Sequence, residues 1–130
     1  MTGGSAQMSA SLPRRAPSIL VVEDEVLIRL AMIDELQDCG FKAFGVGTAS
    51  EAMRVLKVDL EIDAVITDVN LPGEVNGVEL ARWIKVHYPF IPVVVASAHA
   101  PPDLPPDIEY FSKPFHIREI AERLAQRIKK

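Results

Sequence analysis

The sequence is short of several features that define large classes of protein. It has one cysteine, Cys39, in 130 residues, so an internal disulfide is impossible and a reducing compartment is indicated. No apolar run approaches the roughly 18 residues of a membrane-spanning helix. Residues 1–17 lack the apolar core of a secretory signal, and their Gly, Ser, Ala and Pro content predicts a disordered leader.

Positive charge is also scarce. Lys and Arg number 14 against 18 Asp and Glu, and the net charge of −4 disfavours a sequence-independent grip on nucleic acid. Against these absences, 48% of the residues are hydrophobic and 25% are charged, which are ordinary values for a globular protein. A chain of this length supports one domain, which we assign to residues 18–130. We expect a cytoplasmic protein.

Short apolar runs alternate with helix-like patterns along this domain. Continuous apolar runs predict buried strands at 18–22, 41–46, 63–67, 91–96 and 108–112. Apolar residues recur at helical spacing over 26–39, 48–56, 76–87 and 117–128. In the third of these helices Val78, Leu80, Ala81 and Ile84 are the expected inner residues. Repeated βα units predict an α/β fold with a doubly wound, five-stranded parallel sheet and helices on both faces.

One helix of the alternating pattern is missing between the fourth and fifth strands. Ten residues, 98–107, separate Ser97 from the fifth strand, and four of them are proline: Pro101, Pro102, Pro105 and Pro106. Proline lacks the backbone donor and clashes with the preceding turn, so a regular helix is disfavoured here. We therefore expect a turn or an extended Pro-rich loop.

Acidic, hydroxyl and basic side chains stand at the carboxyl ends of four predicted strands. Glu23-Asp24-Glu25 follows the first strand, Asp68 ends the third, Ser97 ends the fourth and Lys113 follows the fifth. Each alone has an ordinary explanation, such as an acid that complements a helix dipole or a serine that caps a helix. Ligands of such sheets bind outside the carboxyl ends of the strands, so we expect these groups to share one crevice.

The chemistry of that set of groups is specific. Carboxylates packed together repel and require a cation, and an all-oxygen site with open positions suits Mg²⁺, with Mn²⁺ as a substitute. Lys113 and Ser97 could then contact other oxygens of a phosphoryl group. Asp68 becomes a candidate nucleophile for phosphoryl transfer that forms an acyl phosphate.

Motifs at successive strand ends resemble the response-regulator receiver family of two-component signalling. They are VVEDE after the first strand, DVNLPG after the third, the serine after the fourth and YFSKPF at the fifth. The resemblance covers about residues 18–130 and implies the family's flavodoxin-like receiver fold, with the fourth helix shortened or replaced by the Pro-rich loop. It implies that Asp68 accepts a phosphoryl group from a histidine kinase or histidine phosphotransfer protein.

The resemblance also implies the residues that hold the metal. Glu23 and Asp24 match the family's acidic pair, with Asp24 as a direct ligand and Glu23 acting through water. Asp68 would complete the set of carboxylates, and Asn70 would offer its backbone carbonyl to Mg²⁺.

The remaining matches concern the phosphoryl group and the switch. Lys113 matches the phosphate-binding lysine, and its bond to Pro114 is expected to be cis. Ser97 matches the switch hydroxyl that moves toward the phosphoryl group, and Tyr110 matches the aromatic switch. The implied chemistry is self-directed phosphoryl transfer and autodephosphorylation, so we do not expect an enzyme with an external substrate.

We expect a stand-alone receiver that signals to an unknown downstream protein through a conformational switch, without direct contact with nucleic acid or membrane. A receiver fragment of a hybrid histidine kinase or longer regulator is an alternative, and so is a non-phosphorylated pseudo-receiver that serves as a binding module. A phosphatase of the haloacid-dehalogenase type is disfavoured because Asn70 stands where that class has its second acid. A Rossmann-type nucleotide binder is disfavoured because VVEDEV has no glycine loop.

Overall fold

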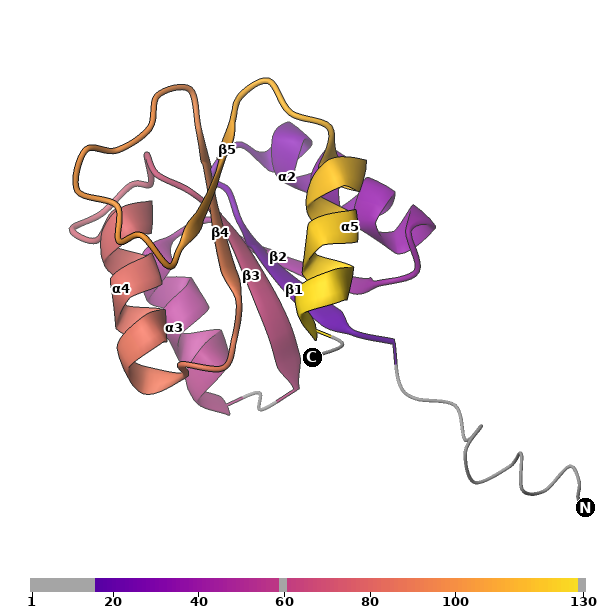
Figure 1. Ribbon diagram of the computed structural model, residues 1–130, viewed down its shortest axis with the longest axis horizontal. Coiled ribbons are helices and arrows are strands. Elements are labelled where there is room, and N and C mark those ends of the chain that lie inside the picture. Colours follow the sequence, from indigo (N-terminus) through magenta and orange to yellow (C-terminus); the bar gives the residue numbers. More distant parts are fainter. Residues whose placement is uncertain (1–15, 59–60, 129–130) are drawn as a thin grey trace, which may run out of the picture.

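The computed structural model describes residues 16–58 and 61–128. Within these ranges the chain forms five strands and four helices (Figure 1), in the order β1 (Ser18–Val22), α2 (Val26–Asp38), β2 (Lys42–Val46), α3 (Ala49–Val58), β3 (Ile62–Asp68), α4 (Gly77–His87), β4 (Val93–Ser97), β5 (Glu109–Ser112) and α5 (Ile117–Ile128). The leader predicted for residues 1–17 lies almost wholly outside the described residues and stays a prediction.

The strands form one parallel sheet in the order β2-β1-β3-β4-β5. Helices α3 and α4 cover one face, and α2 and α5 cover the other (Figure 1). The order reverses at β1, because the chain moves outward to β2 and then returns to β3 on the other side. This confirms the predicted doubly wound, five-stranded parallel sheet, and it places the expected ligand crevice at the carboxyl ends of β1 and β3.

Alternating side chains of the central strands belong to two separate hydrophobic clusters, one on each face of the sheet. In β1, Leu20 and Val22 pack toward α3 and α4, whereas Ile19 and Val21 pack toward α2 and α5. All four are essentially inaccessible to solvent. Because successive side chains of a strand point to opposite faces, a strand covered on both faces must be apolar throughout. This explains the unbroken apolar run from Ile19 to Val22 in β1.

Two helices on the same face begin with side-chain caps. The Asn76 side chain accepts a hydrogen bond from the Glu79 amide, and the Glu79 carboxylate accepts one from the Asn76 amide, which is a capping box at the start of α4. At α3, Thr48 Oγ1 accepts from the Glu51 amide, but the Glu51 carboxylate accepts from Gly47 rather than from Thr48. No helix in the described part of the chain has the length and apolar character to cross a membrane.

Helix α2 departs from the expected amphipathic arrangement. Its buried residues are Met32 and Leu36. Leu27 is 81% exposed and Leu30 is 54% exposed, although both belong to the apolar periodicity of the sequence. By contrast, the inner residues predicted for α4 are all buried: Val78, Leu80, Ala81 and Ile84. The first half of α2 therefore presents an apolar surface beside the carboxyl end of β1.

Residues 98–108, between β4 and β5, form bends and turns. Two ion pairs join this segment to α4: Arg82 to Asp103 at 3.3 Å and Lys85 to Asp107 at 3.6 Å. Leu104 packs against the same hydrophobic cluster that α4 covers. We call residues 98–108 the Pro-rich loop; it is held against α4 at three points.

Candidate functional site

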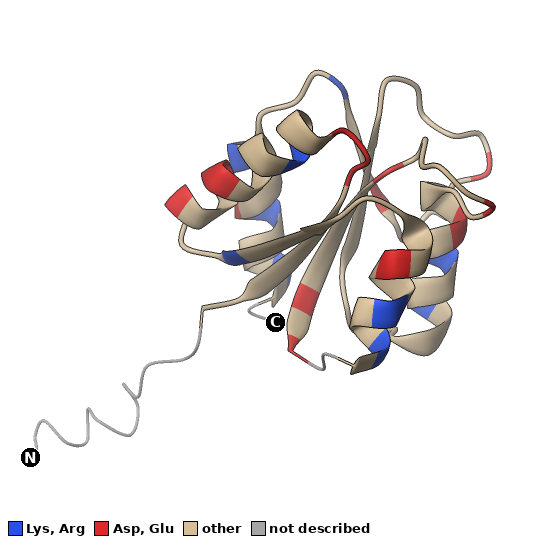
Figure 2. Cartoon of the chain, turned by 180° about the vertical axis from the view of Figure 1, so that it is seen from behind, with Lys and Arg blue, Asp and Glu red and all other residues tan. Residues whose placement is uncertain are grey.

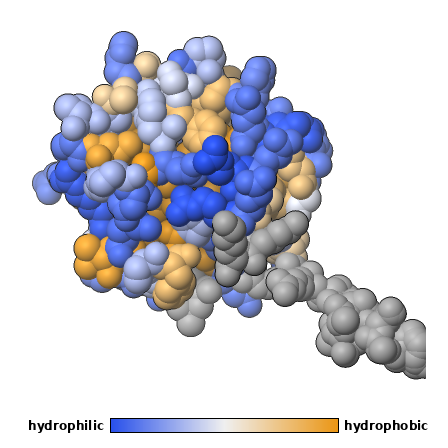
Figure 3. Space-filling view, in the orientation of Figure 1, coloured by the Kyte–Doolittle hydropathy of each residue, from blue (hydrophilic) through white to orange (hydrophobic). Residues whose placement is uncertain are grey.

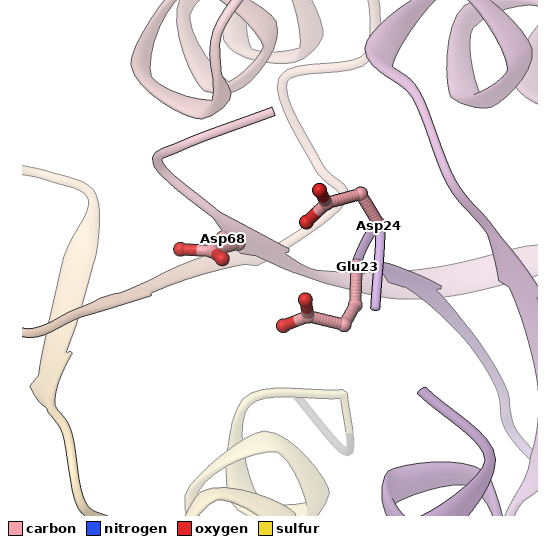
Figure 4. Close-up of side chains that lie close together, drawn as sticks. All are labelled: Glu23, Asp24 and Asp68. Carbon is pink, nitrogen blue, oxygen red and sulfur yellow. The ribbon is translucent and has the colours of Figure 1, made fainter. Parts of the chain in front are cut away.

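Three carboxylates meet at the carboxyl ends of β1 and β3. Glu23 and Asp24 follow β1, Asp68 is the last residue of β3, and one oxygen from each lies within 4.8 Å of the others. Figure 4 shows the three side chains converging from the two strands, and Figure 2 shows acidic residues along this edge of the sheet. The switch-point argument predicted this convergence, because β1 and β3 are neighbours in the sheet.

Lys113 supplies positive charge to this cluster. Its Nζ lies 3.2 Å from Asp68 Oδ2 and 3.7 Å from Glu23 Oε1. The lysine is delivered by β5, two strands away from β3 in the sheet, and its bond to Pro114 is cis as expected. Three carboxylates against one ammonium leave a surplus of negative charge at the site.

Glu23 is the buried member of the cluster, with 3% of its surface exposed. Burial raises the pKa of its carboxyl above the usual value, and the neighbouring Asp68 and Asp24 charges raise it further. A hydrogen bond from the Glu25 amide to Glu23 Oε2, at 3.1 Å, and the Lys113 charge act in the opposite direction. Ionisation of Glu23 is therefore less favourable here than for an exposed glutamate.

The backbone around Asp68 is held from three sides. The Thr67 hydroxyl donates to the Asp68 carbonyl at 2.9 Å, and the Asn70 amide donates to Asp68 Oδ1 at 3.4 Å. Gly77, the first residue of α4, donates its amide to the Val69 carbonyl at 2.9 Å. A Cβ at Gly77 would lie 1.8 Å from the Asp68 carbonyl oxygen, so α4 begins directly against the backbone of Asp68.

Ser97 and Tyr110 meet on the neighbouring strands. Ser97 is buried and lies one residue beyond Ala96, which is the register partner of Asp68. The Tyr110 hydroxyl donates to the Ser97 carbonyl at 2.9 Å, and the Lys113 amide donates to the same carbonyl at 2.8 Å. The two residues predicted as switches are thus in contact through the backbone of Ser97.

The donor set suits a hard divalent cation. Carboxylate oxygens are the ligands that Mg²⁺ and Mn²⁺ prefer, and Asp24 is exposed on the open side of the cluster. Like charges 4.8 Å apart repel by about 1 kcal/mol per pair in water and by about 3.5 kcal/mol at an effective dielectric constant of 20. A cation would remove that repulsion. The part predicted for the Asn70 carbonyl stays a prediction.

Three residues near the site were not found by sequence reasoning. Thr67 and Gly77 fix the backbone of Asp68, and Arg29 of α2 donates from Nη1 to the Glu23 carbonyl at 2.7 Å. A threonine in a strand, a glycine after a helix cap and an arginine on a helix are all ordinary in sequence. Their positions relative to the carboxylates exist only in the folded chain.

Comparison with known proteins agrees with this geometry. The sequence model of the response regulator receiver domain matches residues 19–125. A probable transcriptional regulatory protein of Picosynechococcus is 33% identical, with 92% of this chain aligned to 51% of that protein. The sensor kinase CckA of Brucella abortus is 28% identical, and the match covers 87% of this chain and 13% of the kinase. This chain thus spans about half the length of the first relative and far less of the second.

Among solved structures, a response regulator receiver protein of Sinorhizobium medicae superimposes with a TM-score of 0.79 at 29% identity. The match covers 88% of this chain and 95% of that one. The sheet order, the helices on both faces and the acidic edge of the sheet are thus found in a chain similar to a receiver over nearly its whole length.

Proposed function

This chain belongs to the response regulator receiver domain family of two-component signalling, and on that premise we propose that Asp68 accepts a phosphoryl group from a phosphohistidine. Members of the family are signalling modules rather than enzymes acting on external substrates, and they interact with histidine kinases and phosphotransfer proteins. The observation that carries the proposal is the set of three carboxylates within 4.8 Å, with Lys113 on Asp68 and Glu23.

In the proposed transfer, a carboxylate oxygen of Asp68 attacks the phosphorus of the phosphohistidine. The N–P bond breaks, its electron pair returns to the imidazole, which takes up a proton, and an acyl phosphate remains on Asp68. Lys113, already 3.2 Å from Asp68, would pair with a phosphoryl oxygen, and the Ser97 hydroxyl would move to donate to another. Fixing these groups before the reaction is the main source of rate in phosphoryl transfer.

The carboxylates are the residues that would hold a metal. Glu23, Asp24 and Asp68 would bind Mg²⁺ or Mn²⁺ together with the Asn70 carbonyl. When bound, the cation would neutralise charge on the phosphoryl oxygens. The raised pKa of Glu23 supports this assignment, because this buried acid lies beside two other acids and shares its one positive neighbour, Lys113, with Asp68, so a cation would supply the missing charge.

The exposed apolar surface of α2 is suited to the protein that donates the phosphoryl group. Leu27 and Leu30 are exposed in the helix that begins three residues after Glu23. A phosphohistidine can reach Asp68 only if its carrier rests against this edge of the sheet, so an adjoining apolar surface would be covered in the complex. Exposed apolar patches of this kind mark interaction sites.

We further propose that the Pro-rich loop takes the place of the family's fourth helix and carries the signal. It begins directly after Ser97, and its far end leads into β5, which carries Tyr110. A movement of Ser97 toward the phosphoryl group would pull on the carbonyl that Tyr110 contacts. The loop would then shift against α4, and the unphosphorylated arrangement would become the minor population.

The decisive experiment is intact mass spectrometry after incubation with Mg²⁺ and acetyl phosphate or phosphoramidate. The proposal predicts the gain of one phosphoryl group in the wild type and none in Asp68→Asn or in the presence of a chelator. Because rapid hydrolysis could hide an adduct, thermal stabilisation by beryllofluoride and Mg²⁺ is measured in parallel. If neither an adduct nor stabilisation is found, the pseudo-receiver alternative replaces this function.

A receiver within a longer protein is the second candidate for the context of this chain. The similarity to part of the sensor kinase of Brucella abortus supports it, since that match covers 13% of the kinase. Stand-alone action is equally compatible with the chemistry of the site. The test is phosphotransfer in cis: a kinase module in the same polypeptide would give labelling of Asp68 that does not depend on protein concentration.

A further inference from the structure

The peptide between the two acids that follow β1 is held by a side chain of the next helix, α2. Arg29 is in the first turn of α2, where its amide donates to the Glu25 carbonyl at 2.9 Å. Its guanidinium turns back toward the sheet, and Nη1 donates to the Glu23 carbonyl at 2.7 Å. That carbonyl belongs to the peptide that joins Glu23 to Asp24, so the hydrogen bond sets the direction in which Asp24 leaves the strand.

Two glycines, one in β2 and one just after it, make room for this side chain. A Cβ at Gly45 would lie 2.7 Å from Arg29 Cδ and 2.8 Å from Cγ, and a Cβ at Gly47 would lie 3.2 Å from Nη1. Glycine is disfavoured inside a strand unless another group must approach closely. Gly45 lies within β2, and two side chains of α2 approach it closely: the aliphatic stem of Arg29, and Ile33, whose Cδ1 would lie 2.8 Å from such a Cβ.

Other hydrogen bonds hold the rest of the segment from Glu23 to Glu25, but they involve different atoms. The Glu23 amide donates to the Val46 carbonyl at 3.0 Å, and the Glu23 carboxylate accepts from the Glu25 amide at 3.1 Å. These bonds fix the strand end and the Glu23 side chain. Asp24 is exposed, and it follows directly after the peptide whose carbonyl accepts from Arg29. The direction of that peptide therefore decides whether the Asp24 carboxylate lies in the cluster with Asp68 (Figure 4).

We propose that Arg29 is a positioning residue for the metal-binding acids, and that Gly45 and Gly47 leave room for its side chain. The inference rests on the function proposed above, because it assumes that Glu23 and Asp24 bind Mg²⁺. Groups that orient metal ligands through a hydrogen bond typically change affinity by about 10- to 100-fold when they are removed. Loss of the Arg29 hydrogen bond lets the Glu23–Asp24 peptide rotate, so Mg²⁺ must order the turn as it binds.

The sign of the effect separates positioning from simple electrostatics. A guanidinium close to the site repels a divalent cation, so removal of its charge alone would strengthen Mg²⁺ binding. Removal of the hydrogen bond weakens it. Arg29→Met keeps the aliphatic stem and loses both the charge and the donors, and we expect a net loss of affinity of about tenfold or more.

The test is a calorimetric titration of the unphosphorylated protein with Mg²⁺, which needs no phosphoryl donor. The variants are Arg29→Met, Arg29→Lys and Gly45→Ala. In Gly45→Ala the new Cβ displaces the Arg29 stem, and Ile33 Cδ1 with it, while the charge of Arg29 is kept. Arg82→Met is the matched control, because Arg82 also donates to a backbone carbonyl, that of Asp103 at 2.6 Å, far from the acids along the chain. The thermal midpoint without metal is measured for each variant.

We expect the Mg²⁺ affinity to fall about tenfold or more in Arg29→Met and Gly45→Ala, to fall less in Arg29→Lys, and to stay unchanged in Arg82→Met. A lower thermal midpoint with an unchanged Mg²⁺ affinity in Arg29→Met would overturn the proposal, since it would reveal a structural role only. A tighter affinity would overturn it in favour of electrostatics. If the wild type binds no Mg²⁺, the metal site itself is refuted and the positioning role is refuted with it. If Arg29→Met does not fold, the Mg²⁺ affinities of Gly45→Ala and Arg29→Lys decide whether Arg29 has the positioning role.

Discussion

The contact between Gly77 and the backbone of Asp68 predicts a large effect of Gly77→Ala, which adds a single methyl group. In Gly77→Ala, the new Cβ would lie 1.8 Å from the Asp68 carbonyl oxygen, 2.7 Å from the Asp68 carbonyl carbon and 2.8 Å from Val69 Cα. Real Cβ contacts start at 3.0 Å, so the helix start and the strand end must separate by at least 1.2 Å. The colliding atoms are backbone on both sides and no flexible side chain can yield.

The cost follows from that displacement. Overpacking a well-packed site costs about 1–3 kcal/mol, and this collision belongs at the upper end because two main-chain segments must move. The same movement strains the hydrogen bond that the Gly77 amide donates to the Val69 carbonyl. A shift of about 1 Å in a reacting group can lower a rate about 100-fold. We expect Gly77→Ala to lose about 2–3 kcal/mol of stability and to accept phosphate about 10- to 100-fold more slowly than the wild type.

Gly40→Ala is the control that separates stability from chemistry. Gly40 has φ +93°, which favours glycine, but a Cβ there meets nothing within 4 Å. The substitution should cost about 1–2 kcal/mol through backbone strain alone and leave the phosphorylation rate of the folded protein unchanged. Urea unfolding followed by Trp83 fluorescence gives the stability, and intact mass against time with acetyl phosphate gives the rate. If Gly77→Ala is phosphorylated within about twofold of Gly40→Ala, the reasoning from this contact is wrong.

Three further predictions follow from the site and its surroundings. Glu23→Gln should raise the metal-free melting temperature by a few degrees, about the effect of 1 kcal/mol in a domain of this size. The substitution removes a buried charge and two like-charge contacts within 4.8 Å, and it gives up one opposite charge, Lys113 at 3.7 Å. Because the raised pKa of Glu23 makes wild-type stability fall as pH rises above the ordinary glutamate value, a scanning calorimetry series from pH 4 to 8 should show the gain of the variant growing with pH. Leu27→Ser should slow phosphotransfer from a phosphohistidine protein and leave labelling by acetyl phosphate intact, since Leu27 is 81% exposed; equal rates from both donors in wild type and variant would exclude α2 as the docking surface. Tyr110→Phe should cost no more than about 1 kcal/mol in urea unfolding, because the Ser97 carbonyl keeps its bond from the Lys113 amide; a loss of several kcal/mol would mean that the hydroxyl does more than contact this carbonyl.

The layout of the molecule was largely predictable from the sequence because a sheet covered on both faces leaves a strong signal. Strands such as β1 and β4 are buried at every position and are apolar except for one serine at an end of each. Once the strands are known to be parallel, their carboxyl ends must lie at one edge. Glu23, Asp68 and Lys113 could therefore be brought together before any coordinates were known.

What could not be predicted depends on approach between segments. Periodicity shows which side of a helix is apolar but not what lies against it, and for this reason Leu27 and Leu30 of α2 were not expected to be exposed. The same limit applies to Gly77 and Arg29. Each works through a contact with a backbone carbonyl, and a carbonyl carries no sequence signal because every residue has one.

Face by face, apolar and polar surface are interspersed on the side of the molecule shown in Figure 3. The α2 surface is different because its exposed large apolar residues follow one another within a single turn and a half: Val26, Leu27, Ile28 and Leu30. Exposed apolar residues grouped in this way are typical of a surface that another molecule covers.

The four prolines of the Pro-rich loop have a consequence for how a partner protein can recognise the loop. Pro101, Pro102, Pro105 and Pro106 have their φ angles restricted even in the unfolded chain, so ordering the segment costs less conformational entropy than it would for other residues. With the ion pairs of Arg82 and Lys85, the segment has a preset shape without a helix's hydrogen bonds. A protein that binds to the loop therefore causes little further loss of conformational entropy, and its selectivity must come from complementarity of shape and charge. Exchanging these prolines for glycine would weaken binding mainly by increasing that entropy loss.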